Sequence, residues 1–371
     1  MREMIKAFRE LGHEVHPVIM GGTERKEPMN ASPTSGGLKA KLKPFIPKYL
    51  WETLRDIQLL RFDKRAAIRL EQEIAAFQPD VIYERANYLQ LSGIQTAKKR
   101  SIPHLLEVNT PYVEERVDLS GKSGLLGKAD QHEKAQQLGT NKVLVVSTAL
   151  QNYFHKKHGI PTSHYLVTPN AIAPEKIQVD ASKVEALKTQ YDLHGKTVFG
   201  FVGSVFPWHG VDIMIEAFAE LLPQWPNIRL LIVGGGSYLS QMKQLAKDKG
   251  VAQEAIFTNK VPHSEVFAHI DAMDVTVLAN SHWYGSPVKI FEYAAMGKAI
   301  IAPDNVPVKD VMEDGKDGIL VKPNAQDVKR AMLHMLTHES HRHQMAQRFQ
   351  ATVLQHHIWK KVAQNVCALV S

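Results

Sequence analysis

The feature of this sequence that most limits its fold is a repeated alternation of short apolar segments with amphipathic ones. The strand-like segments form two series: 14–20, 80–84, 104–109, 142–147 and 164–170, then 197–203, 229–235, 255–261, 275–280, 299–303 and 318–321. Helical patterns such as 210–222 and 237–250 separate them. Alternating strands and helices predict parallel sheets, and strands that are apolar almost throughout indicate helices on both faces. We therefore expect an α/β protein with two Rossmann-like, doubly wound parallel-sheet domains.

The two series meet near 172–196, where a polar stretch separates their strands. A length of 371 residues also fits two domains, given a typical size of ~150 residues per domain. We predict an N-terminal domain over 1–176, a C-terminal domain over 177–354, and a last helix over 355–371 that crosses back to the first domain. The chain begins in a helical pattern, although domains of this kind begin with a strand, and a long Gly/Pro/Ser/Lys-rich stretch follows at 22–48.

The composition excludes several classes of protein. Apolar residues make up 44% and charged residues 22%, which is ordinary for a globular chain and unlike a disordered, collagen-like or disulfide-stapled one. The single cysteine, Cys367, cannot form an internal disulfide or a cysteine-based zinc site, so we expect a reducing, cytoplasmic location. No apolar run approaches the ~18–20 residues that span a bilayer, and the opening residues do not resemble a secretory signal.

The positive charge is concentrated in one segment. The chain carries 45 basic against 38 acidic residues, a net charge of +7, and the segment 36–69 alone holds nine basic and three acidic side chains. One interpretation is a solvated helix face. The other is a surface that lies against anionic lipid headgroups, because apolar residues such as Leu38, Phe45, Tyr49 and Trp51 alternate with the cations. No nucleic-acid recognition motif is present, so we expect no nucleic-acid partner.

The segment 286–297, SPVKIFEYAAMG, is the strongest local signal. Ser286 suits a helix cap and Pro287 the first helical position, but Lys289 stands where a capping box would have glutamate. A cation in the first turn of a helix opposes the helix dipole at a cost of about 0.3–1 kcal/mol. An anion bound at the helix start would remove that conflict. We therefore predict that Lys289 meets a phosphate.

Glu292 lies on the same face of this helix as Lys289, among apolar residues. A carboxylate in such surroundings requires a partner. Two interpretations remain open: the two charges satisfy each other, or Lys289 meets phosphate while Glu292 accepts hydrogen bonds from sugar hydroxyls.

Two glycine clusters follow strands of the same half. Gly203 and Ser204 follow one strand, and Gly234 and Gly235 follow the next. Glycines allow close approach of a backbone to a ligand at the carboxyl edge of a sheet, although tight turns explain either cluster alone. His209, in the first glycine loop, is a candidate ligand contact. The histidines of the C-terminal helices lack ligand-like companions, and we predict no bound metal.

With these segments in hand, the chain resembles family 4 of the retaining glycosyltransferases, and within it an exopolysaccharide-associated branch with similar PWHG and SP-x-K-x-FEY sequences. These enzymes have the two-domain GT-B fold. The segments that carry the resemblance are 80–85, 102–111, 142–154, 167–177, 201–218, 230–239, 275–304 and 317–324. The resemblance implies two Rossmann-like domains that face a central cleft.

The implied activity is transfer of a hexose from a UDP- or GDP-linked sugar, with retention of the anomeric configuration and without a cofactor or metal. The implied acceptor is a lipid-linked sugar or polysaccharide in exopolysaccharide or cell-envelope glycan synthesis, at the cytoplasmic face of the membrane. Two alternatives stay open: a non-catalytic nucleotide-sugar-binding subunit, and a sugar-nucleotide epimerase of the same fold.

The resemblance also assigns roles to residues. Glu292 would hold the nucleotide ribose, and backbone amides beside Pro287, mainly that of Val288, would bind the diphosphate. The backbone near Lys260 and Val261 would contact the base. Lys289 would stabilise the charge of the leaving diphosphate.

On the acceptor side we expect Glu84 and Arg85. Asn109 aligns with the family's catalytic histidine; it could accept a hydrogen bond from a sugar hydroxyl but could not carry a proton.

The sequence departs from the family at several positions. Tyr284 stands in place of the first of two motif glutamates, so a sugar-hydroxyl acceptor is lost or replaced by the phenol. Ser204 and His209 stand in place of an arginine and a lysine, which weakens neutralisation of the diphosphate, and Lys289 is expected to compensate. The family's first strand and its glycine loop would lie before Met1, so we expect either a sequence that starts late or a defective product, because that strand is central in such a sheet.

Overall fold

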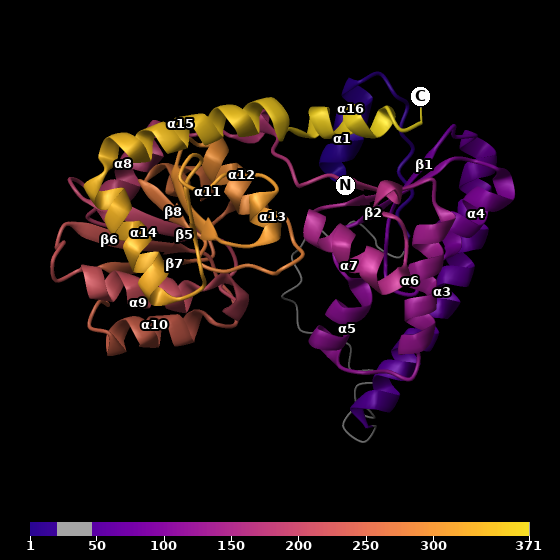
Figure 1. Ribbon diagram of the computed structural model, residues 1–371, viewed down its shortest axis with the longest axis horizontal. Helices are drawn as coiled ribbons and strands as arrows, with labels where there is room; N and C mark the ends of the chain where they lie inside the picture. The colour runs from indigo at the N-terminus through magenta and orange to yellow at the C-terminus, as the bar shows by residue number, and fades with distance from the viewer. Residues whose placement is uncertain (21–46, 371) are drawn as a thin grey trace. The chain divides into compact units, whose positions relative to one another are not determined.

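The computed structural model describes residues 1–20 and 47–370 and divides them into two units. The first comprises Met1–Val145, Leu150–Thr168 and the residues from Gln364 onward; the second comprises Val146–Ala149 and Pro169–Ala363. Two sequence predictions fall partly outside the described residues. They are the loop predicted at 22–48 and the part of the basic segment before residue 47, which includes Leu38, Leu42, Phe45 and Ile46. Figure 1 shows the helices and strands of both units.

The first unit contains a four-stranded parallel sheet in the order β1-β2-β3-β4. Its strands are β1 (Ile82–Arg85), β2 (His104–Val108), β3 (Lys142–Val145) and β4 (Tyr165–Val167). Every residue of β2 is buried, as expected for a central strand covered on both faces. Its helices are α1 (Arg2–Glu10), α3 (Lys48–Phe77), α4 (Ser92–Arg100), α5 (Tyr112–Ser120), α6 (Leu126–Gly139), α7 (Thr148–His158) and the short η2 (Thr162–His164).

The predicted strand at 14–20 is wrong. These residues have no regular secondary structure, and within the described residues β1 pairs with β2 alone. Pro17 has no backbone N–H to give to a sheet. The segment is held by side chains instead: the ring of His16 stacks on Phe77 at 5.1 Å, and its Nε2 lies 2.9 Å from Oε2 of Glu73, so it runs against α3.

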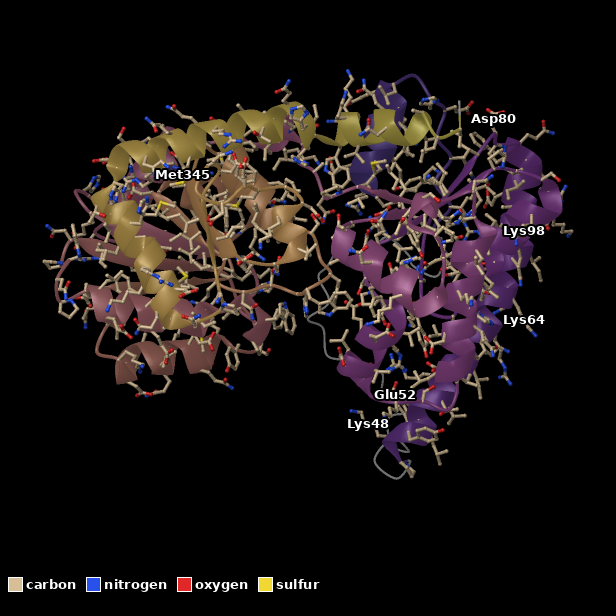
Figure 2. The ribbon with its side chains drawn as sticks, viewed as in Figure 1. Lys48, Glu52, Lys64, Asp80, Lys98 and Met345 are labelled. Carbon is tan, nitrogen blue, oxygen red and sulfur yellow. The ribbon has the colours of Figure 1, made fainter. Side chains whose placement is uncertain are left out.

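Helix α3 turns three of its acidic side chains toward the rest of the first unit. Glu52 and Asp56 are buried, and Arg116 of α5 donates to both, at 2.6 and 3.2 Å. Asp63 accepts hydrogen bonds from the backbone N–H groups of Leu91 and Ser92 at the start of α4. All three acids of the basic segment therefore point inward. The exposed side of α3 opposite these acids carries Arg61 and the labelled Lys64 in Figure 2.

The second unit contains a six-stranded parallel sheet in the order β10-β9-β8-β5-β6-β7. Its strands are β5 (Thr197–Val202), β6 (Ile228–Val233), β7 (Ala255–Asn259), β8 (Val275–Val277), β9 (Ala299–Pro303) and β10 (Ile319–Val321). The chain leaves β5 toward one edge and returns to build the other from β8. This doubly wound order confirms the predicted fold, and ligands of such sheets bind at the carboxyl ends of the two strands where the order reverses.

Helices cover both faces of this sheet. Figure 1 shows α9 and α10 on one side and α11, α12 and α15 on the other. The helices are α8 (Ala181–Gln190), α9 (Val211–Leu221), α10 (Leu239–Asp248), α11 (Val266–Asp271), α12 (Val288–Ala295), α13 (Val306–Lys309), α14 (Ala325–Thr337), α15 (Glu339–His356) and α16 (Trp359–Cys367), with η3 (Pro174–Lys176), η4 (Pro207–His209) and η5 (His263–Glu265). The last residues of α16, from Gln364, group with the first unit.

Helix α12 is fixed to the end of β5 by one buried phenol. Ile290, Phe291 and Ala294 place its apolar face in the core, and Tyr293 beside them is fully buried. The Tyr293 hydroxyl accepts from the backbone N–H of Val202 at 2.8 Å and donates to the carbonyl of the same residue at 3.2 Å. This pair of bonds sets the position of α12 along β5.

We expect Tyr293→Phe to lower the free energy of unfolding by about 1–3 kcal/mol, because it leaves a buried backbone N–H without an acceptor. Urea denaturation of the intact chain measures the effect. Tyr238→Phe is the matched control, since the hydroxyl of the half-buried Tyr238 has no hydrogen-bond partner among the described residues. Equal effects of the two substitutions would contradict the anchoring role.

Candidate functional site

The loops after β5 and β6 touch each other at the carboxyl edge of the second sheet. The N–H of Gly203 donates to the carbonyl of Val233 at 2.9 Å, and that of Val205 donates to Gly235 at 2.8 Å. Gly234 has a φ of +137°, and a Cβ there would lie 2.0 Å from the carbonyl oxygen of Gly203. The two predicted glycine clusters are therefore brought together, and the contact between their backbones by itself requires glycine at 234.

The loop after β7 joins the same edge. The N–H of Gly234 donates to the carbonyl of Asn259 at 2.9 Å. A Cβ on Gly235 would lie 3.7 Å from that of Lys260, which is ordinary contact distance. Lys260 and Val261, the predicted base-contacting positions, thus lie beside the second glycine cluster. Three loops that are far apart in sequence meet at one edge of the sheet.

Helix α12 begins one residue later than predicted. Val288 is its first residue and Pro287 its N-cap, so the predicted cap at Ser286 is wrong. The Ser286 hydroxyl instead accepts from the backbone N–H of Asn170 at 3.0 Å, and its carbonyl accepts from the Asn170 side chain at 2.7 Å. No side chain in the described chain caps the start of α12. The amides of its first turn, including that of Val288, can bind an anion.

Lys289 places a half-buried ammonium group at this helix start. Among the described residues, its one hydrogen-bond partner is Nε2 of His209, at 3.2 Å, and the ring of Phe201 lies 5.5 Å from its Nζ. No described carboxylate lies within ion-pair distance of it. Burial lowers the pKa of Lys289 to about 8. A buried cation without an anion is costly, so the site lacks negative charge that a ligand could supply.

His209 contacts Lys289 through one ring nitrogen and the backbone through the other. Its Nδ1 lies 2.7 Å from the carbonyl oxygen of Ser204, which can only accept, so Nδ1 carries the hydrogen. Nε2 is then the acceptor for Lys289. Burial, with the Lys289 charge next in importance, lowers the pKa of His209 to about 4. Both ring nitrogens of His209 are therefore hydrogen-bonded within the protein, which argues against the predicted direct contact of His209 with a ligand. Ser204, also predicted to bind the donor, provides the carbonyl that accepts from His209.

Glu292 is half-buried one helical turn after Lys289, and burial raises its pKa. Its carboxylate has no hydrogen bond or ion pair with any described residue, so the interpretation in which Lys289 and Glu292 satisfy each other is wrong. His263 and Lys289 are the charges that act on it at longer range. Its carboxylate can accept hydrogen bonds from a ligand's hydroxyl groups.

A stack of aromatic rings fastens the loop after β8 to the loop after β5. Phe206 stacks on Trp208 at 4.6 Å, Trp208 lies 5.0 Å from His282, and His282 stacks on Tyr284 at 5.1 Å. The carbonyl of Tyr284 also accepts from the Ser147 hydroxyl at 2.7 Å. Sequence reasoning singled out Tyr284 but missed the stack; its signal was the density of aromatic residues in 206–208 and 282–284.

In the first unit, the carboxylate of Glu107 accepts hydrogen bonds from polar side chains of β1 and of the loop after β2. Its carboxylate accepts from Arg85 at 2.6 Å, Tyr83 at 2.9 Å and the Asn109 amide N–H₂ at 2.9 Å. The amide oxygen of Asn109 and the hydroxyl of Thr110 are buried and have no hydrogen-bond partner in the parts of the chain that the structure describes. Asn109 is thus oriented with its acceptor atom unused.

Glu84 is used in the interior of the first unit. Its carboxylate lies 2.8 Å from Nε2 of His104 and 2.5 Å from the side-chain nitrogen of Gln90. A Cβ on Gly93 would lie 2.1 Å from the same carboxylate, so glycine there leaves space for it. These contacts argue against the predicted acceptor-side role of Glu84, whereas Arg85 remains half-exposed beside Glu107.

Within residues 1–20 and 47–370, no group of three or more His, Cys, Asp or Glu residues could hold a metal ion, and no helix is long and apolar enough to cross a membrane.

Comparison with known families gives two matches in series. The model described as Glycosyltransferase Family 4 matches residues 1–176, and the one described as Glycosyl transferases group 1 matches 184–351. The chain belongs to glycosyltransferase family 4.

A GDP-mannose-dependent alpha-(1-6)-phosphatidylinositol monomannoside mannosyltransferase of Mycolicibacterium smegmatis is 28% identical over 185 residues, 48% of each chain. An uncharacterized glycosyltransferase of Methanocaldococcus jannaschii is 26% identical over 59% of this chain and 55% of its own. The chain spans about half the length of the curated relatives it matches.

Solved structures establish the fold of this glycosyltransferase. The Anabaena protein HepE in complex with UDP superimposes with a TM-score of 0.69, at 18% identity over 81% of this chain and 80% of that one. Sucrose-phosphate synthase from Thermosynechococcus elongatus gives 0.66, at 17% identity over 84% and 78%. The two parallel-sheet units have the GT-B fold.

We expect the affinity for UDP to fall as the pH rises through about 8, the pKa of Lys289. Below that pH the amine is charged and binds the diphosphate; above it the charge is lost, and the affinity falls by up to about tenfold per pH unit. The charge of the diphosphate of UDP is constant there, because its last proton has a pKa of about 6.

Isothermal titration between pH 7 and 9.5 measures this dependence. Lys289→Arg keeps its charge throughout this range, so its affinity is expected to be weaker but flat above pH 8. A wild-type affinity that does not change between pH 7 and 9.5 would contradict the assignment.

Proposed function

We propose that this glycosyltransferase transfers a hexose from a UDP- or GDP-linked sugar to a hydroxyl of a lipid-linked or polysaccharide acceptor, with retention of the anomeric configuration and without a metal or cofactor. The observation that carries the proposal is the half-buried ammonium of Lys289, which lacks an anionic partner among the described residues. It lies at the start of α12, where the order of the sheet reverses and ligands of this fold bind.

The chemistry follows from where charge develops. The bond between the anomeric carbon and the diphosphate oxygen breaks, and negative charge builds on the diphosphate. Lys289 and the first-turn amides of α12 stabilise that charge with groups that are already in place. The acceptor oxygen bonds to the anomeric carbon on the same face, and its proton passes to the departing phosphate oxygen. Glu292 accepts hydrogen bonds from the ribose hydroxyls.

Asn109 in the first unit is proposed to orient a sugar hydroxyl. Its amide N–H₂ is held by Glu107, so the oxygen is presented as an acceptor. An amide cannot carry a proton at neutral pH, so its role is positioning and not acid–base catalysis.

The class of donor and acceptor is supported by the relatives. The mycobacterial enzyme is named for GDP-mannose and a phosphatidylinositol mannoside, and HepE was solved with UDP and with UDP-glucose. A relative from Streptomyces coelicolor is named an exopolysaccharide phosphotransferase. These names favour a uridine or guanosine diphosphate sugar and an envelope or extracellular glycan.

A non-catalytic nucleotide-sugar-binding subunit is the second candidate. Tyr284 and Asn109 favour it, because they stand in place of a glutamate and a histidine in the family pattern.

We expect Lys289→Ala to lower kcat/KM for hexose transfer by about 30- to 1,000-fold, equivalent to ~2–4 kcal/mol, the range for loss of one preorganised charge-stabilising donor. The assay incubates UDP- and GDP-hexoses with a polyprenyl-diphosphate-linked sugar and follows nucleotide release and product by mass spectrometry. NMR of the glycosidic linkage is expected to show the α configuration from an α-linked donor.

Lys247 is an exposed lysine of α10, and Lys247→Ala is the control; its kcat/KM is expected to equal that of the wild type. Full transfer by Lys289→Ala would remove the role of this residue. Binding of the donor without hydrolysis or transfer would favour the non-catalytic subunit, and a β-linked product would overturn retention.

We also propose that the outer face of α3 lies against an anionic membrane. Glu52, Asp56 and Asp63 are turned inward. The side of the helix that carries Arg61 and Lys64 also carries three exposed apolar side chains: Leu50, Leu54 and Ile68. Cations with apolar side chains between them are typical of interfacial helices.

We expect the double variant Arg61→Glu, Lys64→Glu to bind phosphatidylglycerol vesicles at least tenfold more weakly, because each cation near an anionic surface contributes about 1 kcal/mol. Vesicle co-sedimentation measures this at several salt concentrations. The control is the double variant Lys183→Glu, Lys247→Glu, which makes the same change of charge on the second unit. Binding that is insensitive to salt or equal in both double variants would contradict the membrane proposal.

A further inference from the structure

The hydrogen bond between Lys289 and His209 joins the start of α12 to the loop after β5. We infer that His209 is a positioning residue: with Nδ1–H fixed on the Ser204 carbonyl, its Nε2 serves as a constant hydrogen-bond acceptor that holds the Lys289 ammonium where a diphosphate departs. This inference deepens the proposed function. It reverses the expectation from the family pattern, in which position 209 carries a cation that meets the phosphate itself.

The geometry admits a neutral imidazole at this position and disfavours a charged one. The ring of His209 lies among Phe201, Phe206 and Trp208, with centroids 5.5 to 6.4 Å away. A proton on Nε2 would face the Lys289 ammonium at 3.2 Å with no acceptor between them. Like charges at that distance repel strongly in a water-poor site.

The other charged or titratable groups around the pair do not offset this repulsion. Glu292 lies on α12 and acts on Lys289 at longer range, His263 of η5 acts on Glu292, and His282 of the loop after β8 acts on His209. None of them is hydrogen-bonded to the His209–Lys289 pair. The tautomer of His209 is therefore set by Ser204 on one side and Lys289 on the other.

A lysine needs such an acceptor to be placed accurately. Its side chain is long and flexible, and its ammonium has three N–H donors. One donor is used by His209, so the other two can meet phosphate oxygens. Gly203 provides the space: a Cβ there would lie 3.2 Å from Cε of Lys289. The backbone carbonyl, the imidazole and the ammonium thus form one chain of hydrogen bonds that ends at the bound anion.

Two substitutions separate the functions of the two ring nitrogens. The side-chain oxygen of Gln can take the place of Nε2 and still accept from Lys289. The side-chain nitrogen of Asn can take the place of Nδ1 and still donate to Ser204, but nothing then reaches Lys289. His209→Gln is expected to keep kcat/KM within about fivefold of the wild type. His209→Asn is expected to lose about 10- to 100-fold, mostly in kcat.

The decisive measurement is the effect of His209→Asn in a Lys289→Ala background. A residue that acts through Lys289 costs nothing further once Lys289 is gone, so the double variant is expected to match Lys289→Ala. The inference would be overturned if the losses of kcat/KM from His209→Asn and Lys289→Ala were additive in the double variant. It would also be overturned if His209→Gln and His209→Asn lost the same activity. Neither result would contradict the proposed hexose transfer. His343→Gln and His343→Asn, on the exposed surface of α15, are controls for the substitutions themselves.

A readout without substrate keeps the inference separate from the proposed function. Long-range ¹H–¹⁵N NMR of the unliganded wild-type chain is expected to show His209 neutral at pH 6, with its hydrogen on Nδ1. A hydrogen on Nε2, or a protonated ring at that pH, would overturn the inference even if every variant failed to fold. Absence of nucleotide binding and transfer in the wild type, with the Nδ1–H tautomer present, would overturn the proposed function alone.

Discussion

A half-buried cation without a counter-ion in the described chain determines how the carboxyl edge of the second sheet is built. The ammonium of Lys289 loses water on burial, and a neutral imidazole and an aromatic ring compensate for only part of that loss. Gly203 is needed beside it for space, and His209 as an acceptor. The phenol of Tyr293, one turn further along α12, fixes the helix to β5 so that the ammonium stays at the sheet edge. A bound diphosphate would complete this arrangement.

The alternation of apolar strands and helices was sufficient to predict both parallel sheets, and the misplaced charge in 286–297 was sufficient to single out Lys289. The role of His209 could not be predicted, because it depends on which ring nitrogen carries the hydrogen, and Ser204 decides that only in the folded loop. The cap at Ser286 was displaced because Asn170, more than a hundred residues earlier, takes its hydroxyl. The segment 14–20 has the apolar pattern of a strand but binds α3 through His16.

Helix α3 also has a property that its composition alone could not reveal. Its composition indicated a basic segment, and both a solvated face and a membrane surface agreed with that composition. Only the structure separates the charges: Glu52 and Asp56 meet Arg116, and Asp63 accepts from the start of α4, so these three acids are removed from the surface while Arg61 and Lys64 stay exposed. Over residues 48–69, a net charge counted along the sequence therefore underestimates the positive potential that the helix presents.

The anchoring of α12 has a consequence for how such an enzyme can diversify. Lys289, which is proposed to meet the phosphates, is carried by a helix tied to β5 through Tyr293 and to α15 through Gln350, which donates to the carbonyl of Ala295. The loop around residue 260, by contrast, is largely exposed. On the proposed function, substitutions in this loop can change which base is bound without displacing the Lys289 ammonium, so a new donor preference need not alter the group that stabilises the leaving diphosphate.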